Sequence, residues 1–321
     1  MDVTSSIIII DDTNIYLSSN ELTINKYICS VFFLVSSVSI LFDGLILYVF
    51  FRKRKLLVNV AYKIQLSISV VIFIQQIIFW VTSIFGFTSN LLPNVLDTIL
   101  GAIVQGIFLT LVSFIFLLTF NAFDIFYKQK VLPNINRNKF FTYGLYLCYA
   151  WGVFMTIFYM FPDFSFTYSL VSLGFEYSED FEKAFVAFEI ENKFVIVFLT
   201  ISFVIYIFII IKVIRMRKMS NKSTNATFRW SDVKFIVQGL SNFVCYLFIE
   251  LLWEYDTMLT DSRYSSIIIN FFFLCNSSIN ILLTILMISE IRREIIYLLS
   301  SKKKNKITIV LSHNNFKNNN F

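Results

Sequence analysis

Long runs of apolar residues, separated by short polar stretches, dominate this chain from residue 27 onward. A helix needs about 20 predominantly apolar residues to cross the hydrocarbon core of a bilayer, and these runs are of that order. Backbone groups in hydrocarbon must hydrogen-bond within their own segment, so each run is predicted to be a helix. The seven predicted helices cover residues 27–51, 57–85, 98–124, 140–162, 194–214, 235–253 and 264–289.

The segments outside the predicted helices have patterns of their own. After Pro162, apolar residues alternate with serine and threonine up to Gly174, which predicts a short β-hairpin over the mouth of the bundle. Residues 291–304 combine isoleucine and leucine with arginine and a lysine run, which is typical of an amphipathic helix on a membrane surface. The predicted organisation is therefore an extracellular segment (1–25), a seven-helix bundle (26–290), an interfacial helix (291–304) and a disordered tail (305–321).

Composition supports a membrane protein and excludes several other classes. The sequence is 57% hydrophobic and 15% charged, and its mean hydropathy is +0.72, which is typical of a multispanning protein. The net charge of +6 is spread over short loops, so we expect no binding to nucleic acid. The four cysteines lie in apolar runs without metal-ligand spacing, and the one histidine, His313, lies in the tail. We therefore expect no enzyme activity, no metal site and no cofactor.

Basic residues predict the orientation in the bilayer, because cytoplasmic loops are enriched in lysine and arginine. All but four of the 27 Lys and Arg residues lie on one side of the predicted bundle, whereas most acidic residues lie on the other. The four exceptions are Lys26, Lys183, Lys193 and Arg263. This pattern predicts an all-α, multi-pass protein of the plasma membrane with its N-terminus outside and its C-terminus in the cytoplasm.

Five different short motifs lie along four of the predicted helices. They are Ala61-Tyr62-Lys63-Ile64-Gln65-Leu66-Ser67-Ile68, Asn121-Ala122-Phe123, Phe235-Ile236-Val237-Gln238, Ile281-Leu282-Leu283 and Ser289-Glu290-Ile291-Arg292-Arg293. In this order the motifs resemble the nematode serpentine receptors of class T (the Srt family), over roughly residues 25–296. The resemblance implies a rhodopsin-like, chemosensory G-protein-coupled receptor. Its expected partners are a small-molecule ligand, a heterotrimeric G protein, the lipid bilayer and a second copy of the receptor.

The sequence departs from this family where coupling is expected. The family has an arginine after the asparagine at the inner end of the third helix, and this chain has Ala122 there. A disulfide to the second external loop, a Trp-x-Pro hinge and an Asn-Pro-x-x-Tyr motif are also absent from the sequence. The predicted coupling residues are Asn121, Ala122, Phe123, Asp124 and Lys128. Asp124 and Lys128 are four residues apart, which predicts an exposed ion pair on one helical face.

Two sets of polar residues within the helices are further candidates for function. Gln76, Trp80, Gln105, Glu250, Trp253 and Asn270 are predicted to converge in the outer half of the bundle as a ligand site. Each also has an ordinary interpretation, because interfacial tryptophan anchors helices and Glu250 can reach the outer surface. Asp43, Ser67, Ser69, Asn276 and Asn280 are predicted to form an intramembrane polar node. Such a node ties helices together or acts as an ion-sensitive switch.

Four functions are compatible with these sequence features. The leading hypothesis is a chemosensory receptor that binds a small molecule in the outer half of the bundle and signals through cytoplasmic loops. A secondary transporter is the alternative from another class, but transporters are usually built from internal repeats with broken helices, and the sequence has no visible repeat. A ligand-gated channel is the third, but no predicted helix carries a full polar stripe. The fourth is a seven-helix membrane subunit that does not signal, which is consistent with Ala122 in place of the family's arginine.

Overall fold

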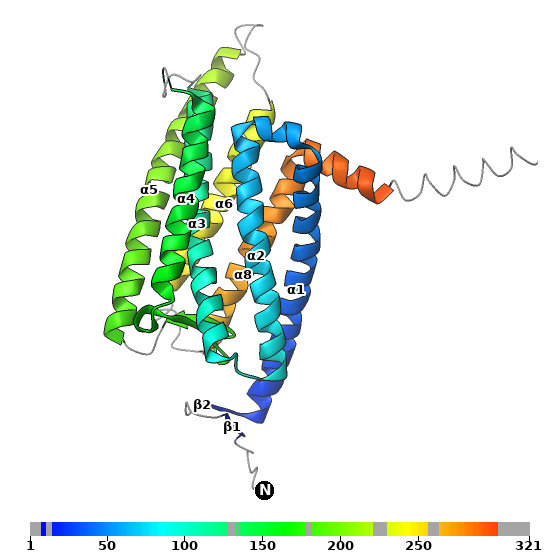
Figure 1. The fold of residues 1–321 in the computed structure, drawn as a ribbon. Helices are drawn as coiled ribbons and strands as arrows, with labels where there is room; N and C mark the ends of the chain where they lie inside the picture. Colours follow the sequence, from blue (N-terminus) through cyan, green and yellow to red (C-terminus); the bar gives the residue numbers. More distant parts are fainter. Residues whose placement is uncertain are drawn as a thin grey trace, which may run out of the picture.

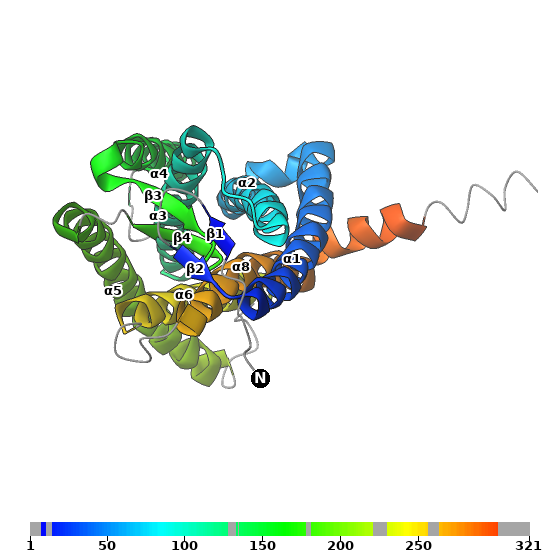
Figure 2. The same ribbon diagram turned by 90° about the horizontal axis from the view of Figure 1, so that it is seen from below.

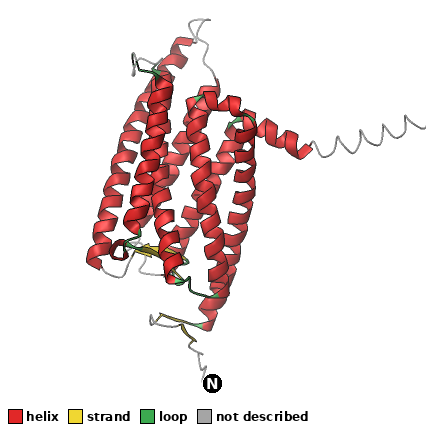
Figure 3. Ribbon diagram, viewed as in Figure 1, coloured by secondary structure: helices red, strands yellow, loops and turns green. Residues whose placement is uncertain are grey.

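The computed structural model describes residues 8–10, 15–127, 133, 135–177, 181–220, 230–255 and 263–300. Seven long helices lie side by side within these ranges (Figure 1). They are α1 (Ser19–Arg52), α2 (Val60–Thr88), α3 (Asn94–Phe126), α4 (Arg137–Tyr159), α5 (Phe181–Ser220), α6 (Trp230–Glu254) and α8 (Arg263–Met287). All seven are long and apolar enough to cross a membrane. The predicted all-α, seven-helix fold class is confirmed, and Figure 3 shows how little strand accompanies the helices.

Local capping signals, rather than the limits of the apolar runs, decide where several helices begin. Ser18 and Glu21 form a capping box, which starts α1 at Ser19 instead of residue 27. Asn59 accepts a hydrogen bond from the Ala61 amide and starts α2, and Asn136 starts α4 in the same way. The largest difference is in α5, which begins at Phe181, well before the predicted start at residue 194.

The centre of the bundle is α3, the most buried of the seven helices. Small residues bring α3 and α4 close together. A Cβ atom on Gly106 would lie 2.0 Å from Thr156 Oγ1, and one on Gly152 would lie 1.8 Å from Thr110 Oγ1. Close approach at small residues is a common basis of helix packing in membranes, where no hydrophobic force acts between helices.

Two hairpins mark one end of the bundle, which we call the hairpin end. Strands β3 (Phe166–Ser169) and β4 (Gly174–Tyr177) pair antiparallel after a short 3-10 turn (η2, Pro162–Phe164), which confirms the predicted hairpin. Strands β1 (Ile8–Ile10) and β2 (Ile15–Leu17) form the second pair at the same end. Viewed from this end, the strands lie across the opening between the helices (Figure 2).

The β3–β4 hairpin is fixed to the bundle without a disulfide, because all four cysteines are free. Asp97 Oδ1, near the start of α3, accepts a hydrogen bond from the Tyr168 amide at 2.7 Å. Gly101 lets β3 approach α3 closely, since a Cβ there would lie 1.6 Å from the Phe166 carbonyl oxygen. Gly174 does the same for Asn270 of α8, whose side chain a Cβ would meet at 2.0 Å. The hairpin therefore forms a fixed cover over the bundle.

The opposite end carries Arg52, the 3-10 helix η1 (Arg54–Val58) and Arg137, and we call it the basic end. A further helix over residues 289–300 follows α8 here and turns away from the bundle (Figure 1). Tyr62 Oη donates to Glu290 Oε2 at 3.1 Å, and Lys53 forms an ion pair with Glu294. These contacts join the extra helix to α2 and to the end of α1. Residues 301–321 lie outside the described part of the chain.

Candidate functional site

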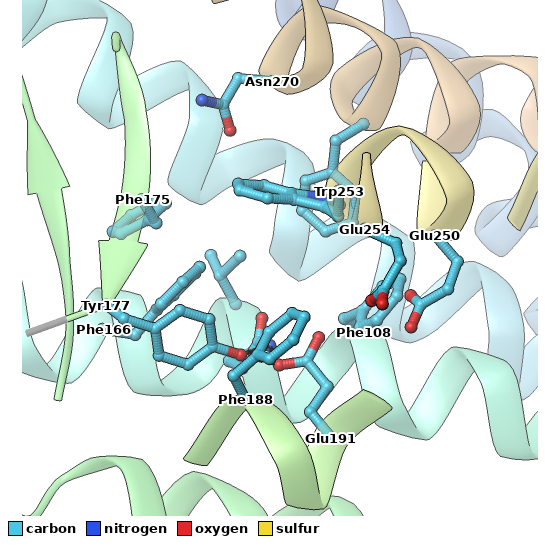
Figure 4. A pocket seen from close by; sticks show the side chains of 13 residues that line it. Phe108, Phe166, Phe175, Tyr177, Phe188, Glu191, Glu250, Trp253, Glu254 and Asn270 are labelled. Atoms are coloured by element: carbon cyan, nitrogen blue, oxygen red, sulfur yellow. Dashed lines mark hydrogen bonds between the residues drawn. The ribbon is translucent and has the colours of Figure 1, made fainter. Parts of the chain in front are cut away.

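A cavity lies just beneath the β3–β4 hairpin, between α3, α5, α6 and α8 (Figure 4). Its empty space, including the open mouth, is about 550 Å³, of which about 30 Å³ admits the centre of a water molecule. Aromatic rings make up most of the wall. The lining residues are Val104, Gln105, Phe108, Phe166, Phe175, Tyr177, Phe188, Glu191, Glu250, Trp253, Glu254, Asn270 and Phe273. Apolar walls with a few polar groups are the usual surroundings of a small ligand.

Four of the six predicted ligand-binding residues line this cavity: Gln105, Glu250, Trp253 and Asn270. The other two lie elsewhere. Gln76 is fully buried and its Nε2 donates to the Leu274 carbonyl of α8 at 3.4 Å. Trp80 turns toward α1, where its Nε1 donates to Ser37 Oγ at 3.0 Å. Both side chains therefore join α2 to its neighbours instead of facing the cavity.

The most buried acid of the cavity, Glu191 of α5, is absent from the set predicted from sequence. Its side chain is only 9% exposed, and its Oε2 accepts hydrogen bonds from Gln105, Tyr177 and Tyr159. The reason for the omission is the early start of α5 at Phe181, because the charged residues before 194 resemble a loop. The sequence did contain a sign that Glu191 lies on a helix. Ala187 and Val195 are apolar, lie four residues before and after Glu191, and share its buried face of α5.

A network of amide side chains ties α6 to α2 and α8 in the half of the bundle nearer the basic end. Gln238 Nε2 of α6 donates to Gln65 Oε1 at 3.0 Å and to Thr284 Oγ1 at 2.8 Å. Gln65 Nε2 also donates to Thr284 Oγ1, at 2.8 Å. One turn further along α6, Asn242 Nδ2 donates to Asn280 Oδ1 at 3.1 Å. We call Gln65, Gln238 and Thr284 the amide tether.

The five residues of the predicted polar node are all largely buried, but they do not form one network among the described residues. Asp43 is fully buried and lies beside the hydroxyl group of Ser69. Asn280 bonds to Asn242 of α6 instead. The remaining two, Ser67 and Asn276, lie beside the hydroxyl groups of Tyr149 and Tyr246 respectively.

At the basic end, an ion pair joins α3 to α4. Asp124 is fully buried, and its Oδ2 lies 2.5 Å from Nε of Arg137, the first residue of α4. Arg137 Nη2 also donates to Asn121 Oδ1 at 3.4 Å. We call Asn121, Asp124 and Arg137 the α3–α4 clasp.

The clasp corrects one prediction made from the sequence. Asp124 was expected to be exposed beside Lys128, and this is wrong, because Asp124 is fully buried and forms an ion pair with Arg137 of α4. Lys128 lies outside the described residues. Ala122 is 8% exposed, and Phe123 packs against Tyr127 with ring centroids 4.6 Å apart. Of the five predicted coupling residues, therefore, Asn121, Ala122 and Asp124 are buried.

Comparison with solved structures shows what this arrangement is similar to. The crystal structure of squid rhodopsin superposes with a TM-score of 0.69, covering 90% of this chain and 87% of the rhodopsin chain. The chain has the fold of rhodopsin. Sequence identity over the match is 12%, so the likeness establishes the fold and not the ligand.

Two further comparisons find no relative by sequence. No protein-family model matches the chain, and no curated protein matches it. Membership of the class T receptors therefore stays a prediction. The comparison establishes the seven-helix fold of rhodopsin, and all seven long helices of the described chain are apolar enough to cross a membrane.

Proposed function

We propose that the chain is a chemosensory G-protein-coupled receptor of the nematode class T type. A small molecule binds in the cavity at the hairpin end, and a G protein binds at the basic end. The observation that carries this proposal is the rhodopsin fold with a largely aromatic cavity in the half of the bundle beneath the hairpin. The enclosed position under a fixed hairpin favours recognition of a small molecule over recognition of a large one.

Helix α6 offers a physical route between the two ends. Glu250 and Trp253 of α6 line the cavity, and Gln238 of the same helix belongs to the amide tether. A ligand that binds better when α6 has moved away from α2 and α8 shifts the population toward that state. The movement breaks the amide tether and opens the basic end to a partner.

The secondary transporter has less support than the receptor. The seven helices are each continuous in the described part of the chain, whereas secondary transporters usually bind their substrates at broken helices. A non-signalling seven-helix subunit would share the fold, so only a functional assay separates it from a receptor.

The proposal requires the hairpin end to face outside and the basic end to face the cytoplasm of cells that carry the receptor in their plasma membrane. An epitope tag placed before Lys26 is expected to be stained on intact cells, because the basic loops stay inside. A tag after Lys306 is expected to be stained only after permeabilisation. Flow cytometry with both tags measures this, and the reverse pattern would contradict every assignment of function to an end.

Ligand-dependent signalling is the direct test of the proposal. Cells that express the full chain with dissociation sensors for each G-protein class are exposed to a panel of small organic molecules. At least one compound is expected to activate one class. Val104→Phe, at a fully buried position in the cavity wall, is expected to reduce that response at least tenfold, because the phenyl ring is larger than the valine side chain and fills part of the cavity.

The matched control for this test is Val153→Phe, on the exposed face of α4, which is expected to leave the response unchanged. Surface level is measured for all variants, since overpacking also lowers stability. A response that is equally strong in Val104→Phe would place the ligand outside the cavity. The absence of any response at a normal surface level would favour the non-signalling subunit.

A further inference from the structure

The cavity has an unbalanced charge. Its 13 lining residues include Glu191, Glu250 and Glu254, and none of them is a lysine, arginine or histidine. Figure 4 shows the three carboxylate groups turned toward one region of the cavity, next to Phe108. A site with this lining attracts cations and rejects anions. An ionised carboxylate carries a negative charge, and it can accept hydrogen bonds but cannot donate them.

Glu191 has an oxygen left over for a ligand. Its Oε2 already accepts from Gln105, Tyr177 and Tyr159, and these donors fix the side chain in place. Its Oε1 forms no hydrogen bond within the described part of the chain, although only 9% of the residue is exposed. A held carboxylate with one free oxygen is an arrangement that suits a hydrogen-bonded ammonium group.

Glu250 is the second acid of the cavity with a carboxylate oxygen free to bind a ligand. It forms no hydrogen bond or ion pair with any described residue, and it lies close enough to Glu191 and Glu254 to interact electrostatically with both. Glu254, nearer the surface, accepts a hydrogen bond from Asn192 Nδ2 at 2.8 Å. Like charges repel strongly in a site of low dielectric constant, and a bound cation relieves that repulsion.

The rest of the wall points to an organic cation rather than a metal ion. Among the described residues, no three His, Cys, Asp or Glu side chains are placed to hold a metal ion together. Phe108, Phe188 and Trp253 instead line the cavity together with the acids, and the faces of aromatic rings attract organic ammonium groups. Since only about 30 Å³ admits the centre of a water molecule, a ligand enters by displacing some of these rings.

From these observations, and resting on the proposed function, we infer that the ligand is a small organic cation. Its charged nitrogen lies between Glu191 and Glu250, and its carbon skeleton packs on the aromatic wall beneath the hairpin. Primary amines and quaternary ammonium ions with a short apolar body belong to this class.

Binding of matched probe pairs tests the inference directly. The full chain is purified in lipid nanodiscs, and its thermal unfolding is followed with a panel of arylalkyl and alkyl amines. Each amine is paired with the neutral alcohol of the same carbon skeleton, such as 2-phenylethylamine and 2-phenylethanol. At least one amine is expected to raise the unfolding temperature with increasing concentration, while its alcohol does not, because only a compound that binds the folded state stabilises it.

Two variants and one control locate the charge recognition. Glu191→Gln and Glu250→Gln are each expected to weaken the apparent affinity for the amine at least tenfold. Glu250→Gln is the more robust test, because Glu250 has no hydrogen bond in the described chain for the substitution to disturb. Glu189→Gln is the control, since Glu189 lies outside the cavity and pairs with Lys193.

The outcomes separate this inference from the proposed function. Equal stabilisation by amine and alcohol, no stabilisation by any amine, or unchanged amine affinity in Glu250→Gln would overturn the inference. A neutral activator found in the signalling screen and unaffected by Glu250→Gln would also overturn it, and would leave the receptor function standing. Amine binding without activation of any G protein would support the inference and contradict the proposed function.

Discussion

Replacing Arg137 with alanine is expected to remove most of the protein from the cell surface. The side chain is 23% exposed and is the ion-pair partner of Asp124, which is 0% exposed. Removal of one partner from a buried ion pair leaves an uncompensated charge and costs about 3–5 kcal/mol. Total stabilities are only about 5–15 kcal/mol, so the loss is a large share. Flow cytometry of a tagged chain measures the surface level, and thermal unfolding in detergent measures the stability.

Neutralising both partners is expected to restore much of the loss, because no charge is then stranded. The double variant Asp124→Asn/Arg137→Gln should therefore reach the surface better than Arg137→Ala. Arg52→Ala is the matched control, since Arg52 is exposed at the same end and has no ion pair within the described chain. If Arg137→Ala and Arg52→Ala behave alike, the α3–α4 clasp contributes nothing to the fold.

Replacing Gln238 with leucine is expected to raise ligand-free signalling about tenfold. The substitution removes the two hydrogen bonds by which α6 is held to Gln65 and Thr284. Hydrogen bonds between membrane helices are worth roughly 0.6–2 kcal/mol each, and about 1.4 kcal/mol changes an equilibrium tenfold. If these bonds exist only in the closed state, their loss increases the population of the open state by that factor. G-protein sensors in the absence of ligand report the change.

Val237→Leu provides the control for this variant. Val237 adjoins Gln238 in sequence, but its side chain is 39% exposed on the outer face of α6. It is expected to signal like the unsubstituted chain at an equal surface level. Unchanged ligand-free signalling in Gln238→Leu would show that the amide tether does not hold the closed state.

The sequence predicted the helices well, because bilayer thickness imposes a run length that is visible without any knowledge of packing. It also predicted the hairpin after Pro162, where the alternation of apolar and polar residues is local. The helix ends were less accurate. Capping by Ser18 and the charged first turns of α5 depend on side-chain geometry that hydropathy does not contain.

Which way each helix faces could not be predicted from one sequence. Gln76 and Trp80 are four residues apart and share a face, but that face meets α8 and α1 rather than the cavity. Asp124 looked exposed because it ends an apolar run, whereas its partner Arg137 reaches it from the start of α4, across a loop. Rotation of a helix about its axis depends on its neighbours, and those neighbours are distant in sequence.

In the proposed function, movement of α6 at the basic end activates a G protein. The most direct measurement is the rate of guanine-nucleotide exchange on a panel of purified heterotrimeric G proteins, catalysed by the full chain in lipid nanodiscs. Gln238→Leu is expected to accelerate exchange on at least one G protein without any ligand, about tenfold above the unsubstituted chain and above Val237→Leu. No acceleration of exchange on any G protein, by any of these correctly folded proteins, would contradict the proposed function.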